Sequence, residues 1–187
     1  MKTVLRFALA VVAIAAALGM SGCTDTSSRN TLTVVSVNNG NAYFSDLINE
    51  ADTAHIFIPV DQVKIKLGNI PNGGGAPLAP GDPYSEIVVT GYTVTYDNGI
   101  YTPVTGGLNL RIPSGGTAEG TIVLSNSVEK AALLGSMGGS TISTIARIHF
   151  TGYNYIDGIR NGDPVWADAA LTVQVGNFGD TNVNTGT

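Results

Sequence analysis

Apolar and polar residues alternate along most of the chain from Thr31 onward, with a period of two residues. In the stretch DQVKIKLGN, Val63, Ile65 and Leu67 fall on one face, and the glutamine and lysines between them fall on the other. Such alternation is typical of strands with one buried and one hydrated face. The runs that show it are separated by Gly, Pro and Asn turn signals and span residues 31–37, 55–70, 85–99, 106–112, 120–125, 143–153 and 165–175.

One stretch, NSVEKAALLGSMGG from Asn126, has the pattern of a helix instead. Asn126 is a suitable N-cap, and Glu129 stands at the capping-box position three residues later. Gly138 or Gly139 would end the helix. We therefore predict a single short helix that crosses between two late strands.

Two further segments interrupt the strand pattern. YFSDLINEA, residues 43–51, predicts a short helical turn. PNGGGAPLAPGDPY, residues 71–84, holds too much Pro and Gly for regular structure and predicts the longest exposed loop. Such a loop either connects two strands or carries a binding function.

These elements predict an all-β fold of about seven strands. The strand number and the alternation resemble those of immunoglobulin-like and fibronectin-like domains, and the resemblance implies an antiparallel β-sandwich with one short crossover helix. The Cys-Trp-Cys hallmark of immunoglobulin domains is absent. A sandwich of this kind implies no particular function.

The last two runs are expected to form a hairpin with a defined register. Placing the loop near residues 158–163 pairs Phe150 with Leu171 inside and Tyr155 with Trp166 outside. A slip of one residue would mix core and surface faces, so the pattern favours this register or one shifted by two.

The first 23 residues, MKTVLRFALAVVAIAAALGMSGC, have the three-part layout of a secretory signal. Lys2 and Arg6 precede an apolar run over residues 7–18, and small residues follow it. A transmembrane helix is the alternative, but it needs about 20 apolar residues, and no basic stop-transfer cluster follows this run.

Residues 20–23, MSGC, resemble a bacterial lipobox. The resemblance implies cleavage before Cys23, which then carries a thioether-linked diacylglycerol and an amide-linked acyl chain. Each buried CH₂ contributes about 0.8 kcal/mol, so three chains anchor a protein stably in a membrane. The alternative, a free reactive thiol, needs a basic setting that Thr24 and Asp25 do not offer. Because Cys23 is the only cysteine, an intrachain disulfide is excluded.

This interpretation divides the chain into four parts. Residues 1–22 are the signal peptide, 23–30 the lipidated cysteine with a flexible tether, 31–178 the β-sandwich domain and 179–187 a polar tail. The expected location is the bacterial cell envelope. Thr24 is not the aspartate that, after the lipidated cysteine of some Gram-negative lipoproteins, retains them on the inner membrane. The outer membrane is therefore favoured.

The charge balance argues against a nucleic-acid partner. Removal of residues 1–22 takes away Lys2 and Arg6 and leaves seven basic and fourteen acidic side chains, a net charge of -7. Proteins that bind nucleic acids need a basic surface to replace the counterions of the phosphates.

No motif in the sequence carries recognisable catalytic chemistry. The two histidines, His55 and His149, lack the spacing of a zinc site, and neither a G-x-S-x-G elbow nor a phosphate-binding loop occurs. We therefore predict a non-enzymatic protein without a cofactor. A Ser-His-Asp triad assembled in space would be the remaining route to a hydrolase.

Polar residues gather at the tip of the predicted final hairpin. Asp157, Asn161 and Asp163 could supply oxygen ligands for calcium, but their spacing is not that of an EF-hand, and Asp-Gly and Asn-Gly pairs are usual in turns. We predict no metal site there.

The same hairpin carries Tyr153, Tyr155 and Trp166 on the face opposite the core. Rigid aromatic rings beside Asn and Asp suit the binding of a sugar or a peptide. The alternative is that these rings pack on the sheet or under the long loop. The sequence thus favours a membrane-anchored interaction or assembly module that binds an envelope protein or glycan. The alternatives are an envelope protein that binds a small ligand, a glycan or calcium, and, less favoured, a hydrolase.

Overall fold

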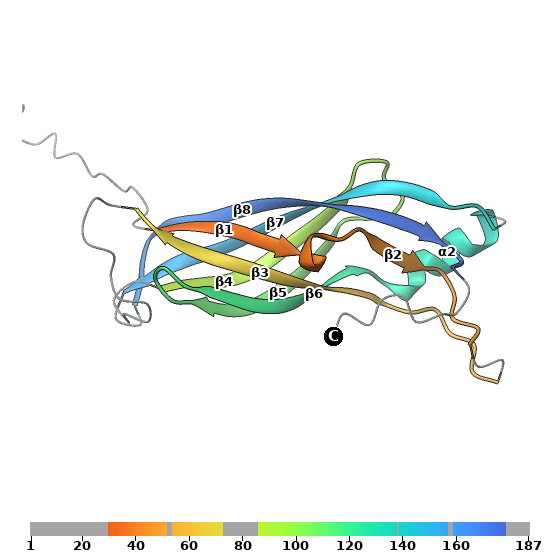
Figure 1. Cartoon of the computed structure of the whole chain (residues 1–187), viewed down its shortest axis with the longest axis horizontal. Helices are drawn as coiled ribbons and strands as arrows, with labels where there is room; N and C mark the ends of the chain where they lie inside the picture. The colour runs from red at the N-terminus through yellow and green to blue at the C-terminus, as the bar shows by residue number, and fades with distance from the viewer. Residues whose placement is uncertain (1–29, 52–53, 73–85, 138, 157–158, 179–187) are drawn as a thin grey trace, which may run out of the picture.

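The computed structural model describes residues 30–51, 54–72, 86–137, 139–156 and 159–178. Within these residues, eight strands, one 3-10 turn and one α-helix form two sheets (Figure 1). The all-β class with a single helix is confirmed. In chain order the elements are β1 (Asn30–Val37), η1 (Asn38–Gly40), β2 (Tyr43–Asp46), β3 (Asp61–Pro71), β4 (Glu86–Tyr96), β5 (Val104–Ile112), β6 (Thr117–Ser125), α2 (Ser127–Met137), β7 (Ile142–Ile156) and β8 (Ile159–Gly176).

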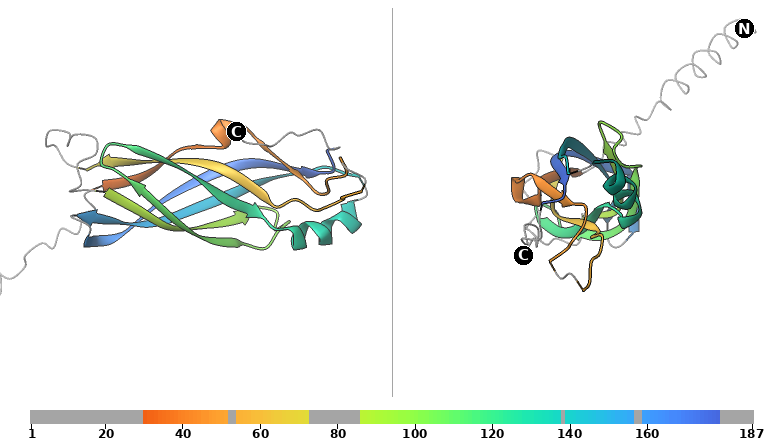
Figure 2. Two further views of the ribbon diagram at one scale, coloured as in Figure 1. Left: turned by 90° about the horizontal axis from the view of Figure 1, so that it is seen from below. Right: turned by 90° about the vertical axis from the view of Figure 1, so that its right-hand side faces the viewer.

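The strands are divided between two sheets that enclose one core. The smaller sheet has the order β1-β3-β6, and the larger, curled sheet has the order β2-β8-β7-β4-β5. All strand pairs are antiparallel except β2 with β8. The sheets adjoin at both edges, because β1 lies beside β8 and β5 beside β6. Figure 2 shows the resulting elongated body, with α2 at one end.

The beginning of the domain passes from one sheet to the other. β1 pairs with β3, and η1 then redirects the chain through Asn38 and Asn39, whose φ angles of 49° and 52° lie in the left-handed region that asparagine tolerates. β2 continues in the larger sheet, parallel to β8. One short stretch of sequence thus joins the two sheets along their shared edge.

The helical turn predicted over residues 43–51 is wrong, because its first half forms β2. Tyr43 and Ser45 are buried while their neighbours are partly exposed, which is the period of a strand. The N–H of Leu47 donates to the carbonyl of Gly176 at 2.9 Å and extends the contact with β8. A four-residue strand is too short to reveal its period in the sequence.

The run predicted over residues 55–70 also begins later than expected. β3 starts at Asp61, and before it Phe57 forms only an isolated bridge with Asn49. Pro59, which has no N–H to donate, stands in between. From Val63 onward the predicted alternation is confirmed.

The helix predicted from Asn126 is confirmed as α2. The side-chain oxygen of Asn126 accepts the N–H of Glu129 at 3.0 Å, as expected of an N-cap. Gly139, with a φ of 84°, follows the last turn. The carboxylate of Glu129 does not complete a capping box, because it accepts the N–H of Thr102 at 2.9 Å.

The predicted faces of β7 and β8 are confirmed, but the predicted register is wrong by four residues. Phe150 lies opposite Ala167 rather than Leu171, and Leu171 lies opposite Ala146. Side chains alternate between the two faces of a strand, so a register shifted by four residues still pairs core residues with core residues. The apolar pattern of the sequence therefore could not distinguish the two registers. Large residues face small ones in the observed register, which lets the core side chains interdigitate.

A bulge in β4 changes which of its residues face the core. Tyr92, Val94 and Tyr96 alternate along the strand and are buried in the core. The register shifts between Val89 and Gly91, so Val88 does not share that face and is buried outside the main core cluster.

Gly152 of β7 lies against this part of β4. A Cβ at Gly152 would lie 2.6 Å from the carbonyl oxygen of Val88, a backbone atom that cannot turn away. Gly152→Ala is therefore expected to lower the free energy of unfolding by about 1–3 kcal/mol in chemical denaturation. Gly107→Ala on β5 is the matched control, because nothing lies within 4 Å of its Cβ position. Equal stability of the two variants would contradict this packing.

A buried polar cluster occupies the end of the core nearest α2. Asp61 and Lys130 form an ion pair there, with 3 % and 0 % of their surfaces exposed. Three tyrosines, Tyr43, Tyr96 and Tyr101, surround it. Burial, reinforced by the charge of Asp61, raises their pKa values, to about 12 for Tyr101.

These tyrosines make the fold sensitive to alkali. Above pH ~10 they ionise in the unfolded chain but stay protonated in the folded one, so stability falls by about 1.4 kcal/mol per pH unit for each tyrosine. Burial lowers the pKa of Lys130. This shift makes stability rise with pH, but it involves one proton, whereas three tyrosines act in the other direction. Denaturation measured at pH ~9 and pH ~11 should show the loss, and Tyr101→Phe should reduce it. Equal stability at both pH values would contradict this prediction.

Candidate functional site

The outer face of β7 and β8 carries the three aromatic residues that the sequence singles out. Because Phe150 and Ala167 point into the core, odd-numbered residues of β7 and even-numbered residues of β8 point outward. Trp166 has 61 % of its surface exposed there, whereas Tyr153 and Tyr155 are half-buried. The three side chains thus share one face.

The two tyrosines differ from the tryptophan in how they are held. The guanidinium carbon of Arg160 lies 3.3 Å from the centroid of the Tyr153 ring, a cation–π contact. Tyr155 pairs with Arg160 on one side and Glu86 on the other. The expected pairing of Tyr155 with Trp166 is wrong, since Trp166 lies opposite Thr151. The tyrosines are held by the sheet, and the indole is left accessible.

Two hydrogen-bonded side-chain pairs lie further along the same face. His149 Nδ1 lies 2.6 Å from Asp168 Oδ1, across the β7–β8 ladder. The Arg147 guanidinium donates two hydrogen bonds to Asp97, at 2.5 and 2.9 Å, and holds the pKa of that carboxyl below its usual range. All four groups keep contact with solvent. They form a solvent-exposed array of hydrogen-bond donors and acceptors.

A hollow of about 590 Å³ lies among these pairs. Ala170 faces Arg147 across the ladder, and its methyl group leaves the space between the longer side chains unfilled. Trp166 is the next outward residue of β8 before Asp168, which lines the hollow. The residues that line the hollow are Thr93, Thr95, Arg147, Ile148, His149, Asp168, Ala169 and Ala170.

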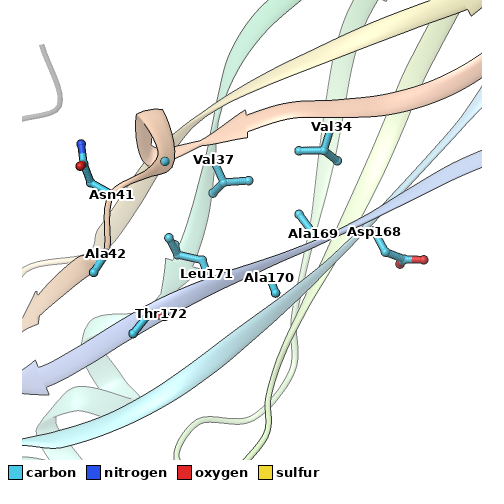
Figure 3. A pocket seen from close by; sticks show the side chains of 10 residues that line it. Val34, Val37, Asn41, Ala42, Asp168, Ala169, Ala170, Leu171 and Thr172 are labelled. Carbon is cyan, nitrogen blue, oxygen red and sulfur yellow. The ribbon is translucent and has the colours of Figure 1, made fainter.

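A second hollow, of about 380 Å³, lies where β1 and η1 separate from β8 (Figure 3). Val37 and Leu171 lie on its two sides and belong to the core. Asn41 and Asp168 provide polar groups at its margins. Asp168 therefore lines both hollows, which lie on either side of β8.

Sequence reasoning identified the aromatic residues but not the hollow beside them. The pairing of His149 with Asp168 was not predicted, because the two residues are nineteen positions apart and meet only in the observed register. The tripeptide Asp168-Ala169-Ala170 was the available signal, since small residues on the outer face of a strand leave a depression. His55, the other histidine, is exposed in the segment before β3.

Several predicted features lie outside the described residues. They include Cys23 with the whole leader, most of the 71–84 loop, Asp157 and the tail from residue 179; the side chains of Asn161 and Asp163 are likewise not described. In the part of the chain that is described, no group of three or more His, Cys, Asp or Glu could hold a metal ion. No helix among those residues is long and apolar enough to span a bilayer.

In comparisons with known proteins, no family model and no curated protein matches this chain.

Proposed function

We propose that this protein is a lipid-anchored, non-catalytic interaction module of the bacterial cell envelope that binds a glycan on the outer face of β7 and β8. The observation that carries the binding proposal is Trp166, a large apolar side chain that is 61 % exposed on β8, two residues before Asp168 in the wall of a hollow. A flat indole offers apolar area with few rotamers to freeze, and it suits the face of a sugar ring.

The polar groups around the hollow suit the same class of ligand. Hydroxyls of a sugar could pair with the Asp168 carboxylate, the His149 imidazole and the Thr93 hydroxyl, all of which line the hollow. The hydrogen bond between His149 and Asp168 holds two of these groups before binding, which reduces the entropy that binding would cost.

The lipid anchor is proposed from the leader, and the fold is compatible with it. β1 begins at Asn30, seven residues after Cys23, so the tether can reach at most about 25 Å. Asn30 lies at the end of the body that also holds the β7–β8 tip, and α2 lies at the opposite end (Figure 1). The β7–β8 tip would thus lie nearer the membrane and α2 would point away from it.

We also propose that the two sheets form an immunoglobulin-like sandwich. The orders β1-β3-β6 and β8-β7-β4 correspond to strands A-B-E and G-F-C of that fold, and β5 occupies the place of C′. The passage of β1 and β2 from one sheet to the other corresponds to a divided first strand. The chain departs from the pattern in lacking the cysteine pair and in placing α2 between strands E and F.

Trp166→Ala tests the binding surface. The substitution is expected to change the free energy of unfolding by no more than about 0.5 kcal/mol, because the side chain is exposed. It should weaken pelleting of the full chain with purified peptidoglycan at least about tenfold, the usual effect of losing an aromatic anchor. Trp166 is the only tryptophan of the chain, so its fluorescence should shift when the wild-type protein binds soluble peptidoglycan fragments.

Val128→Ala is the control for this experiment. Val128 is 77 % exposed on α2, at the far end of the body, and its loss should leave pelleting unchanged. Unchanged pelleting of Trp166→Ala would contradict the proposal. A loss of several kcal/mol in its stability would instead assign the indole to packing.

A further inference from the structure

The ion pair between Asp61 and Lys130 is enclosed by protein on every side. Lys130 Nζ lies 2.5 Å from Asp61 Oδ1, on a side chain with no exposed surface. A lysine amine donates in three directions, and its second acceptor here is the backbone carbonyl of Asp46, at 2.8 Å. The amine is thereby held against one carboxyl oxygen.

The other carboxyl oxygen is held by two hydroxyl groups. Ser45 of β2 and Ser125 of β6 each donate to Asp61 Oδ2 at 2.5 Å. Donors fixed at one oxygen stabilise negative charge that develops there when a nucleophile adds to the carbonyl carbon. Asp61 thus presents Oδ2 to two serine hydroxyls and Oδ1 to the amine and, at 3.5 Å, to the Tyr43 hydroxyl.

The buried surroundings of Asp61 and Lys130 favour the uncharged forms of both side chains. Tyr43, Tyr96 and Tyr101 enclose the cluster, and burial lowers the pKa of the Lys130 amine. A proton that moves from the ammonium to Oδ1 converts the ion pair into a neutral amine and a neutral acid, which a dry site tolerates better. A neutral amine is the form that acts as a nucleophile.

We propose that Lys130 and Asp61 condense to form an intramolecular amide bond that ties α2 to β3. After the proton transfer, Nζ adds to the carboxyl carbon of Asp61, and Oδ2 carries the charge of the intermediate. The bond from that carbon to Oδ1 then breaks, and Oδ1 leaves as water with a second proton from Nζ. One C–N bond forms and one C–O bond breaks, so the step needs no oxidant or other reactant.

The amide would close a covalent ring between positions 69 residues apart in the sequence. Cross-links that close long loops restrict the unfolded chain, as disulfides do, and this chain has only one cysteine. This inference concerns the opposite end of the molecule from the β7–β8 tip and does not depend on the proposed glycan site.

Peptide mapping of the denatured full chain tests the amide. Trypsin cleaves after Lys and Arg, so a chain without the amide yields peptides 30–64, 112–130 and 131–147. An acylated Lys130 resists cleavage. The proposal predicts peptide 30–64 joined to peptide 112–147, with a mass equal to their sum minus one water molecule.

Asp61→Ala is the control, and it should yield no joined peptide even in the fraction that folds. Recovery of the three separate peptides from the wild-type chain, with no joined species, would show an ordinary ion pair and overturn the proposal. A joined species that persists in Asp61→Ala would also overturn it, because the bond would then involve another residue.

Discussion

Lys130→Met is expected to lower the free energy of unfolding by about 3–5 kcal/mol, measured by chemical denaturation at neutral pH. The substitution keeps most of the apolar stem but leaves the Asp61 carboxylate buried without its cation. Transfer of an unpaired charge out of water costs far more than the packing that remains can offset. The loss is expected with or without the amide, because both states neutralise Asp61 through Lys130.

Lys66→Met is the matched control, because it removes the same charge from an ion pair that is exposed instead of buried. Lys66 Nζ also pairs with a carboxylate, at 3.0 Å from Glu119, but both side chains are exposed. Surface pairs contribute about 0–1 kcal/mol, so this variant should remain close to the wild type. A similar small loss for Lys130→Met would contradict the account of the cluster.

A double variant separates the charge from the packing. Lys130→Met combined with Asp61→Leu removes both charges, and replacing a buried pair by apolar residues is often nearly neutral. The double variant should therefore be more stable than Lys130→Met alone. Ser45 and Ser125 would still lose their acceptor, so full recovery is not expected.

Cys23→Ala is expected to abolish the proposed membrane attachment. Without the thiol no diacylglycerol can be attached, and the acyl chains supply the binding energy. Fractionation of a bacterial host that expresses the full chain should show the wild type with the membranes and the variant elsewhere. Ser28→Ala, within the proposed tether, is the control and should fractionate like the wild type. A membrane-bound Cys23→Ala protein would contradict anchoring through this residue.

The sequence predicted those parts of the fold that depend on local periodicity. The buried face of β3, the core residues of β7 and β8 and the N-cap of α2 at Asn126 all follow from spacing along one segment. The outward position of Trp166 follows from the same alternation, since even-numbered residues of β8 point away from the core. Each of these features is encoded within about ten residues of sequence.

Features that depend on contacts between distant segments could not be read in this way. The β7–β8 register, the β4 bulge between Val89 and Gly91 and the pairing of β2 with β8 are settled by packing between strands. The cluster of Asp61 and Lys130 joins residues 69 positions apart, and in the sequence both look like ordinary surface charges. The hollow beside Trp166 needs the correct register before its residues come together.

The measurement that tests the proposed lipid anchor, on which the assignment to the cell envelope rests, most directly is the mass of the mature N-terminal peptide, taken from the full chain after expression in a Gram-negative host. The account predicts a peptide that begins at Cys23 and carries a diacylglycerol and an amide-linked acyl chain, recovered from the membrane fraction. A peptide with an unmodified Cys23, from a protein that does not sediment with membranes, would contradict it.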